Sequence, residues 1–196
     1  MTAPNDLACR LAPSSFPSLV DNLAWELILT AYHADSSDLV SKEVLDYQGF
    51  GDASRELAQQ IVDSNFHPEI IIAIARGGML PAGALSYALG VKLADAINVE
   101  FYTDVETTLP DPVLLAPLLD SDAILDKRVL VVDDVVDSGR TLQLVLDILT
   151  KMGAEARSAV LYAKPTTVVM PDYVWRRTDQ WIVFPWSAEP PVQASR

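Results

Sequence analysis

Two adjacent carboxylates stand between a run of apolar residues and a short loop of small and hydroxyl-bearing residues. The segment reads Val129-Leu130-Val131-Val132-Asp133-Asp134-Val135-Val136-Asp137-Ser138-Gly139-Arg140-Thr141. The run from Val129 to Val132 predicts a buried strand, and the residues from Arg140 to Met152 predict a helix closed by Gly153. The Asp137 to Thr141 loop can bind a phosphate through two hydroxyls and the free N–H groups at the start of that helix.

The loop differs from the two commonest phosphate-binding motifs. It has no Gly-Lys-Ser/Thr, as a Walker A loop has, and no Gly-x-Gly-x-x-Gly, as the dinucleotide fingerprint has. Two carboxylates beside a phosphate would repel it unless they bind something else, such as sugar hydroxyls or a magnesium ion. A phosphorylated ribose with bound Mg²⁺ satisfies both demands. The alternative is that Asp133 and Asp134 merely end a strand and that Gly139 serves a turn.

A second candidate loop, Arg76-Gly77-Gly78, directly follows the apolar run Ile70 to Ala75. Glycines allow close approach of the backbone to an anion, and an arginine offers a fork of donors for phosphate oxygens. Taken alone, this tripeptide is compatible with any turn. Beside the first motif, it indicates a second anion-binding loop.

The segment from Val129 to Thr141 resembles the PRPP-binding motif of type I phosphoribosyltransferases, and Arg76-Gly77-Gly78 resembles their pyrophosphate loop. The resemblance implies that Asp133 and Asp134 hold the ribose hydroxyls, with Asp134 the better candidate for contact with Mg²⁺. It makes Asp137 the general base and also places it among the PRPP-binding residues. It assigns the 5′-phosphate of PRPP to Ser138, Gly139, Arg140 and Thr141, with Arg140 in a variable position, and the pyrophosphate to Arg76 and Gly77. A cis peptide is expected at Ala75-Arg76.

The carboxyl-terminal part resembles the xanthine-guanine phosphoribosyltransferases. The matching stretches are Leu161-Tyr162-Ala163-Lys164-Pro165, Asp172-Tyr173-Val174 and Trp181-Ile182-Val183-Phe184-Pro185-Trp186. The Lys164 ammonium can donate to an exocyclic 6-oxo group, Trp181 can stack on a base, and the Ile182 backbone can contact the edge at the 2-position. The alternatives are that Lys164 is a surface cation and that Trp181 belongs to the core. Trp186 is expected to pack rather than to touch ligand.

Strands alternating with helices must position these residues. Asp52 can cap a helix that runs to Val62, and Pro81 to Leu89 predicts a short helix ended by Gly90. The remaining predicted strands are Ile70–Ala75, Ala96–Tyr102, Ala159–Tyr162 and Trp181–Phe184. This order implies an α/β fold with a mostly parallel central sheet flanked by helices, and a ligand site at the carboxyl ends of the strands. The resemblance implies the type I phosphoribosyltransferase fold, with a small hood built from the chain ends.

Length and charge bound the organisation and the partners. The 196 residues allow one domain, which we place at 41–196, and residues 1–40 form an N-terminal extension of unknown role. A net charge of -13 opposes binding to nucleic acid or to anionic membranes. The single Cys9 and the lack of a signal-peptide pattern predict a cytoplasmic protein. The resemblance implies a homodimer or homotetramer, and the apolar stretch from Val113 to Leu119 is available for such a contact.

The expected reaction is transfer of 5-phosphoribosyl from PRPP to a 6-oxopurine base, with Mg²⁺ as cofactor. In related 6-oxopurine enzymes, the segment before the main motif usually brings a basic residue over the pyrophosphate. This chain departs from that pattern, because it holds no Lys or Arg between Lys92 and Lys127. It carries Phe101-Tyr102 and the acids Asp104, Glu106 and Asp111, which would repel pyrophosphate. Two alternatives therefore stay open: an enzyme of the same fold with a non-purine or specialised acceptor, and a non-catalytic regulator that binds PRPP or a nucleotide.

Overall fold

The computed structural model describes residues 41–100, 103–104, 107–108, 113–114 and 121–194. The chain divides into two units, Met1–Val40 and Ser41–Arg196, and all described residues belong to the second. The predictions for the N-terminal extension, for Phe101-Tyr102, and for Glu106 and Asp111 lie outside the described residues. None of the described helices is long and apolar enough to cross a membrane.

A mostly parallel sheet forms the centre of the second unit, as expected. Its order is β6-β3-β2-β7-β8-β9. The parallel strands are β2 (Ile70–Ala75), β3 (Leu93–Glu100), β7 (Arg128–Val136), β8 (Glu155–Ala163) and β9 (Tyr173–Arg177), and β6 (Val113–Leu114) pairs antiparallel with β3. A short antiparallel ribbon joins β4 (Thr103–Asp104) to β5 (Thr107–Thr108).

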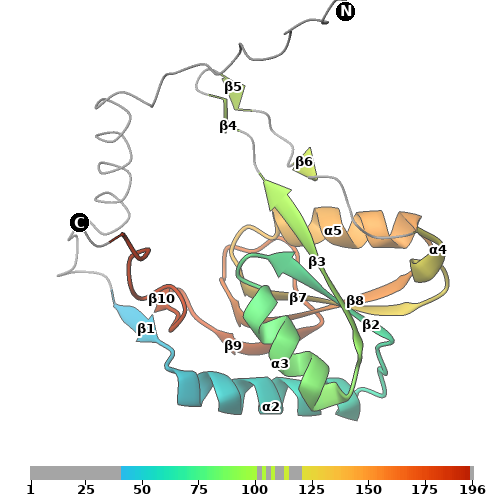
Figure 1. The fold of residues 1–196 in the computed structure, drawn as a ribbon, viewed down its shortest axis with the longest axis horizontal. Coiled ribbons are helices and arrows are strands. Elements are labelled where there is room, and N and C mark those ends of the chain that lie inside the picture. The colour runs from blue at the N-terminus through green and yellow to red at the C-terminus, as the bar shows by residue number, and fades with distance from the viewer. Residues whose placement is uncertain (1–40, 101–102, 105–106, 109–112, 115–120, 195–196) are drawn as a thin grey trace, which may run out of the picture. The chain divides into compact units, whose positions relative to one another are not determined.

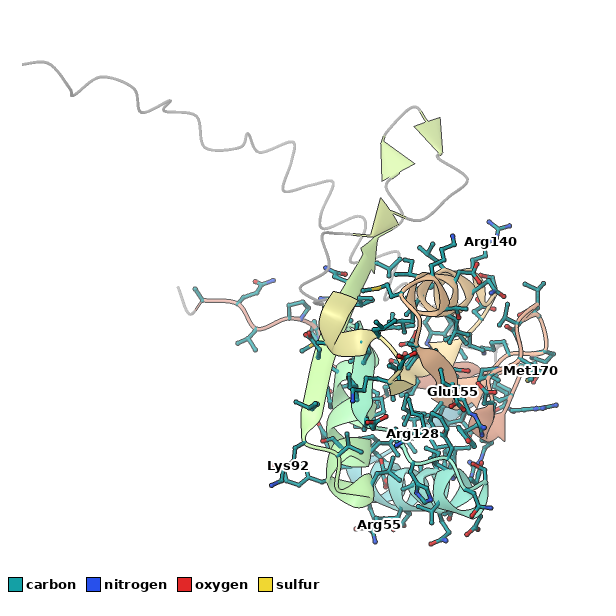
Figure 2. The ribbon with its side chains drawn as sticks, turned by 90° about the vertical axis from the view of Figure 1, so that its right-hand side faces the viewer. Arg55, Lys92, Arg128, Arg140, Glu155 and Met170 are labelled. Atoms are coloured by element: carbon teal, nitrogen blue, oxygen red, sulfur yellow. The ribbon has the colours of Figure 1, made fainter. Side chains whose placement is uncertain are left out.

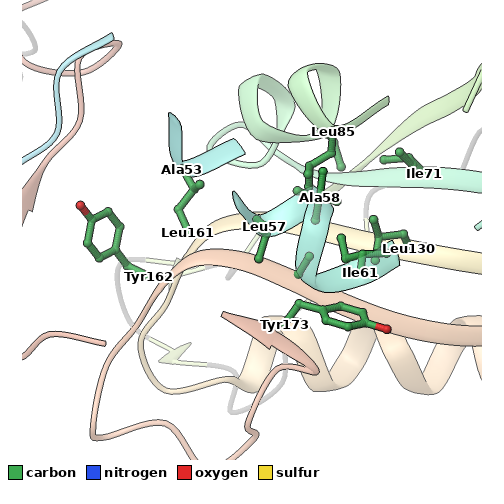
Figure 3. Close-up of a cluster of buried hydrophobic side chains, with 14 of the residues drawn as sticks. Ala53, Leu57, Ala58, Ile61, Ile71, Leu85, Leu130, Leu161, Tyr162 and Tyr173 are labelled. Atoms are coloured by element: carbon green, nitrogen blue, oxygen red, sulfur yellow. The ribbon is translucent and has the colours of Figure 1, made fainter. Parts of the chain in front are cut away.

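Helices cover both faces of this sheet (Figure 1). On one face, α2 (Tyr47–Asp63) and α3 (Met79–Leu89) pack on alternate strand residues such as Ile71 and Leu130. On the other face, α5 (Arg140–Lys151) packs on the residues between them, such as Ile72 and Val131. A short helix, α4 (Ser121–Ile124), precedes β7. Figure 3 shows the cluster of buried side chains between the sheet and the helices α2 and α3. The strands read as continuous apolar runs because both their faces are buried.

The α2 helix begins earlier than its pattern predicts. Its N-cap is Asp46, whose carboxylate accepts a hydrogen bond from the Gly49 N–H at 2.7 Å. The expected cap, Asp52, lies inside the helix and accepts a hydrogen bond from the Gln48 side chain at 3.2 Å. Gly49 and Gly51 lower the helix propensity of the first turns, which is why the helical pattern becomes clear only after them.

Replacing Asp46 by Ala should lower the free energy of unfolding by about 1 kcal/mol, the usual loss for a capping side chain. Asp52→Ala is the matched control on the same helix, and it should cost less than about 0.5 kcal/mol because it removes one exposed side-chain pair. Chemical denaturation of both variants measures the difference. Equal losses would contradict the assignment of Asp46 as the cap.

Strand β7 extends past Val132, where the predicted strand ends, and continues to Val136. Asp133 pairs with Val160 and Val136 pairs with Ala163, both in β8. The pairing with β2 covers Ile70 to Ala73 and reaches Val132 on β7. The two aspartates therefore lie where β7 is still paired with β8 on one side but is no longer paired with β2 on the other.

A separate two-stranded sheet joins the two ends of the described unit. Here β1 (Lys42–Val44) runs parallel to β10 (Trp181–Val183), and the Leu45 N–H donates to the Val183 carbonyl at 3.0 Å. Next to β10, Phe184 and Trp186 stack with ring centroids 4.8 Å apart. This pairing matches the small hood expected from the chain ends, and Trp186 packs as predicted.

Candidate functional site

The Arg76-Gly77-Gly78 loop and the acid pair meet at one place. A Cβ atom on Gly77 would collide with both carboxylate oxygens of Asp134, so the Gly77 backbone lies directly against that carboxylate. The peptide bond before the loop, Ala75-Arg76, is cis as expected. Arg76 itself is exposed. The Arg76-Gly77-Gly78 loop and the acid pair of β7 thus belong to one site.

Gly78 is packed as tightly as Gly77, but against backbone. A Cβ atom there would collide with the Val132 carbonyl oxygen and would lie 2.7 Å from the Ile74 carbonyl oxygen. The Gly78 N–H also donates to the Ile74 carbonyl at 2.9 Å. The loop therefore packs against the end of β2 and the middle of β7 without space for a side chain at Gly78, and α3 starts directly after it.

The acid pair is half-buried and has perturbed acidity. Burial raises the pKa of Asp133 well above its ordinary value, and the neighbouring Asp134 carboxylate raises it further. Burial also raises the pKa of Asp134, against the opposing effect of hydrogen bonds from the Val135 backbone and the Trp186 side chain. A bound cation or sugar hydroxyls would stabilise the charged pair, so the site is built for a ligand that supplies one of them.

Asp133→Asn should stabilise the free protein at pH 7 by about 1–2 kcal/mol, within the usual range for one substitution. A carboxyl whose pKa is raised on folding stabilises the fold when protonated and loses that contribution as the pH rises through its raised pKa. Asn keeps an oxygen to accept the Asp134 N–H, which donates to Asp133 Oδ1 at 2.9 Å. The stabilisation should shrink as the pH falls toward 4. Denaturation of the wild type and the variant in EDTA at several pH values measures this stabilisation, and the exposed Asp52→Asn is the control. A stabilisation that does not change with pH would contradict the prediction.

The loop predicted to bind a phosphate follows β7 directly. Asp137, Ser138 and Arg140 are exposed, and Thr141 is half-buried. Gly139 is buried at the N-cap of α5 with φ of 83°, where a Cβ atom would lie 2.6 Å from Thr167 Oγ1. Arg140 is the first residue of α5, and Figure 2 shows it at the edge of the described unit. The exposed start of α5 can therefore accept an anion on its N–H groups.

Residues 164 to 169 form the wall opposite this loop. The Lys164 N–H donates to the Val136 carbonyl at 2.9 Å, and the Val168 N–H donates to the Ser138 carbonyl at 3.2 Å. Between them, the Thr166 hydroxyl donates to Asp137 Oδ1 at 2.9 Å. Sequence analysis missed Thr166, since no motif or spacing marks it except its place two residues after Lys164.

Of the residues predicted to contact a base, Lys164 lies on this wall, while Trp181 and Ile182 lie on β10. The half-buried Lys164 donates its ammonium to the Gln180 carbonyl, next to Trp181. Trp181 is 55% exposed, so the alternative that it belongs to the core is wrong. Ile182 is half-buried and pairs with Glu43 of β1. An ammonium bonded to a carbonyl beside an exposed indole can also donate to a 6-oxo group of a stacked base.

The donor set near the two loops fits magnesium bound together with a phosphorylated ligand. Within the described residues, no group of three or more His, Cys, Asp or Glu side chains could hold a metal. Mg²⁺ is commonly bound by one or two carboxylates together with substrate phosphates and water. Asp133 and Asp134 would supply those carboxylates, and oxygens of the ligand and of water would complete the coordination.

Comparison with known proteins agrees with this geometry. A family model described as the phosphoribosyl transferase domain matches residues 40–193. The chain is 37% identical over 123 residues to the xanthine-guanine phosphoribosyltransferase of Gluconobacter oxydans, covering 61% of this chain and 69% of that protein. It is 35% identical over 138 residues to the enzyme of the same name from Desulfotalea psychrophila, covering 69% of this chain and 80% of that protein.

Solved structures give the same result for the fold. A purine phosphoribosyltransferase from Pyrococcus horikoshii is 39% identical, with a TM-score of 0.65 and coverage of 79% of this chain and 99% of that chain. A protein from Neisseria gonorrhoeae with bound ppGpp is 26% identical, with a TM-score of 0.67 and coverage of 76% and 90%. The sheet, the paired loops and these matches together establish that the chain has the type I phosphoribosyltransferase fold and belongs to the phosphoribosyl transferase family, near the xanthine-guanine enzymes.

Proposed function

We propose that residues 41–196 transfer the 5-phosphoribosyl group from PRPP to a 6-oxopurine (guanine, xanthine or hypoxanthine) and release pyrophosphate, a purine salvage reaction. The observation that carries the proposal is the contact of the Asp134 carboxylate with the Gly77 backbone. It joins the loop suited to pyrophosphate to the acids suited to ribose hydroxyls. The names of the relatives support the same substrate pair.

In this reaction, a bond forms between a purine nitrogen and the anomeric carbon of ribose as the bond from that carbon to pyrophosphate breaks. Arg76 and Gly77 bind the pyrophosphate, while Asp133 and Asp134 hold the ribose hydroxyls. Backbone N–H groups and hydroxyls of Ser138, Gly139, Arg140 and Thr141 bind the 5′-phosphate. Asp137 accepts the proton that leaves the purine nitrogen. Catalysis rests on positioning and charge, since the attacking atom belongs to the base.

Mg²⁺ is the proposed cofactor. Asp134 is its first candidate ligand, and Asp133 stands beside it. When bound, the ion offsets negative charge on the departing pyrophosphate. This matters in a chain of net charge -13, where local positive charge must counter the overall repulsion of an anionic substrate.

Lys164 is proposed to select 6-oxopurines. Its ammonium already donates to a carbonyl oxygen, that of Gln180, and a 6-oxo group offers the same kind of acceptor. Adenine presents an amino donor at that position and would leave the ammonium unpaired. Trp181 supplies an exposed face for stacking on the base. The backbone of Ile182, the next residue of β10, is proposed to contact the edge of the base at its 2-position.

Lys164→Met should reduce kcat/KM for guanine by about 10- to 100-fold, as expected for loss of a hydrogen bond from a charged donor. The side chain keeps its length and apolar stem but has no donor for the 6-oxo group. Initial rates of pyrophosphate release measure the effect, with Lys151→Met at the exposed end of α5 as the control. Unchanged use of guanine by the Lys164 variant would contradict its proposed role.

The function is tested by pyrophosphate release from PRPP and Mg²⁺ with guanine, xanthine, hypoxanthine, adenine and uracil offered separately. Turnover restricted to the first three is expected. Turnover of uracil or of another acceptor would replace the purine proposal with the alternative of a specialised acceptor. PRPP binding without turnover of any base would exclude the enzyme proposal for these substrates.

A second candidate function is binding of a guanine nucleotide without turnover. The observation that favours it is the ppGpp in the structure of the Neisseria gonorrhoeae protein. The same pair of anion-binding loops could receive the two phosphorylated ends of such a nucleotide. Calorimetric titration with ppGpp and with PRPP separates the two ideas: tight ppGpp binding in a chain that releases no pyrophosphate would favour the regulator.

We also propose that the protein forms a homodimer or homotetramer and acts in the cytoplasm. Helix α3 leaves Met79, Leu80 and Tyr87 exposed, with Tyr87 93% exposed, and these apolar side chains suit burial against another subunit. The single cysteine suits a reducing compartment. Light scattering after gel filtration measures the mass; a monomer at micromolar concentration would contradict the oligomer.

A further inference from the structure

Thr166 makes the closest side-chain contact with the proposed general base. Its hydroxyl donates to Asp137 Oδ1 at 2.9 Å and also lies 3.5 Å from the Asp137 carbonyl oxygen. Asp137 is exposed at the end of β7, so its side chain has little packing to restrict its rotation. In the described part of the chain, no other donor to the Asp137 carboxylate is found, and Oδ2 is left available.

The turn that carries Thr166 is itself held at both ends by the loop it faces. The Lys164 N–H donates to the Val136 carbonyl at 2.9 Å, just before Asp137. The Val168 N–H donates to the Ser138 carbonyl at 3.2 Å, just after it. Within the turn, the Thr167 N–H donates to the Lys164 carbonyl at 3.2 Å. The Thr166 hydroxyl is thus fixed relative to the Asp137 backbone, which a side chain on an unattached loop would not be.

We propose that Thr166 is a positioning residue: its hydroxyl binds Asp137 Oδ1 and holds the carboxylate with Oδ2 directed to the proton of the incoming base. This rests on the proposed function, in which Asp137 takes that proton. The same turn carries Lys164, the proposed contact to the 6-oxo group. The turn therefore sets the spacing between the group that selects the base and the group that deprotonates it.

Correct placement matters because proton transfer requires the acceptor oxygen within hydrogen-bonding reach of the proton. A carboxylate free to rotate would spend much of its time in unproductive orientations, and small misplacements of a reacting group lower rates strongly. Thr166 would act mainly on turnover, because its hydroxyl bonds the Asp137 side chain and none of the side chains assigned to the ribose hydroxyls, the 5′-phosphate or the pyrophosphate.

The test uses Thr166→Val, which replaces the hydroxyl by a methyl of similar size, and Thr166→Ser, which keeps the hydroxyl. With guanine as acceptor, Thr166→Val should lower kcat by about tenfold while KM for PRPP changes by less than about twofold. Thr166→Ser should retain at least about half of the wild-type kcat, since the donor remains. Loss of kcat in both variants, or in neither, would overturn the proposal.

A double-mutant cycle with Asp137→Asn separates this proposal from the proposed function. In the Asp137→Asn background, Thr166→Val should change kcat by less than about twofold, because no proton acceptor remains to be positioned. A further tenfold loss there would show that Thr166 acts by another route. Full activity of Asp137→Asn alone would instead remove the base assignment, and with it the premise of the positioning role.

The same four proteins are titrated by calorimetry with 9-deaza-GMP, an analogue that keeps an N–H at the imidazole-ring nitrogen and needs no turnover. Thr166→Val should weaken its binding several-fold in the wild-type background, because Asp137 Oδ2 accepts that N–H in the proposed arrangement. The effect should be smaller in the Asp137→Asn background, because a carboxamide whose oxygen binds Thr166 presents an NH2 group in place of Oδ2. Equal weakening in both backgrounds, or in neither, would overturn the positioning role even in a chain that turns over none of the bases.

Discussion

Asp137→Asn should lower kcat by about 100-fold or more and leave KM for PRPP within about threefold of the wild-type value. The carboxamide has the size of the carboxylate and can still accept the Thr166 hydroxyl, which lies 2.9 Å from Oδ1 in the wild type. It cannot take a proton from the purine nitrogen. The expected loss is therefore in the chemical step, while the contacts of PRPP with the loops after β2 and β7 remain.

Steady-state kinetics with guanine as acceptor measure this effect. The matched control is Asp147→Asn on α5, where an exposed carboxylate accepts a hydrogen bond from the Gln143 side chain at 2.7 Å. The control removes one negative charge from the same part of the chain without touching the site. Equal kcat values for the Asp137 variant and the control would remove Asp137 from its proposed role.

Gly78→Ala should lower the free energy of unfolding by about 3 kcal/mol, at the upper end of the usual cost of inserting a methyl where no space exists. The added Cβ would collide with the Val132 carbonyl oxygen and crowd the Ile74 carbonyl oxygen. Both atoms belong to buried strands of the central sheet, so neither can move away as the end of a flexible side chain can. The backbone angles of Gly78, with φ of -68° and ψ of -12°, are ordinary, and the loss comes from the collision alone.

Gly83→Ala is the control, because it lies in the same helix and an added Cβ there meets nothing within 4 Å. Alanine favours helix more than glycine does, so this variant should be as stable as the wild type or more stable by up to about 1 kcal/mol. Thermal unfolding separates the two variants by on the order of 10 °C in Tm for a domain of this size. Similar Tm values would show that the loop can move away from β7.

The sequence was sufficient for features that depend on local pattern. The apolar runs at Ile70 to Ala75 and Val129 to Val132 predicted buried strands because a strand covered on both faces has no polar face. Gly139, with φ of 83°, marks the start of α5, and Gly90, with φ of 70°, marks the end of α3. Strands alternating with helices predicted the mostly parallel sheet, since such connections cross back over the sheet.

Element boundaries were less predictable where two weak signals competed. The glycines near the start of α2 hid the cap at Asp46. The acids at Asp133 and Asp134 resembled the start of a loop, although β7 continues through them to Val136 because β8 runs beside it. Whether a polar residue such as Asp133 belongs to a strand depends on whether a neighbouring strand pairs with it, and no local sequence pattern shows where that neighbouring strand ends.

The contacts that make the site were decided by tertiary structure alone. The register between β2 and β7 sets Gly77 against Asp134, and the turn after β8 sets Thr166 against Asp137. The pairing of β1 with β10 sets Trp181 and Ile182 in the hood. Side-chain types and spacing determined which residues have the chemistry for a phosphorylated ribose and a base. Which of them touch was determined by strand register and turn packing, because these join segments far apart in the chain, where local periodicity carries no information.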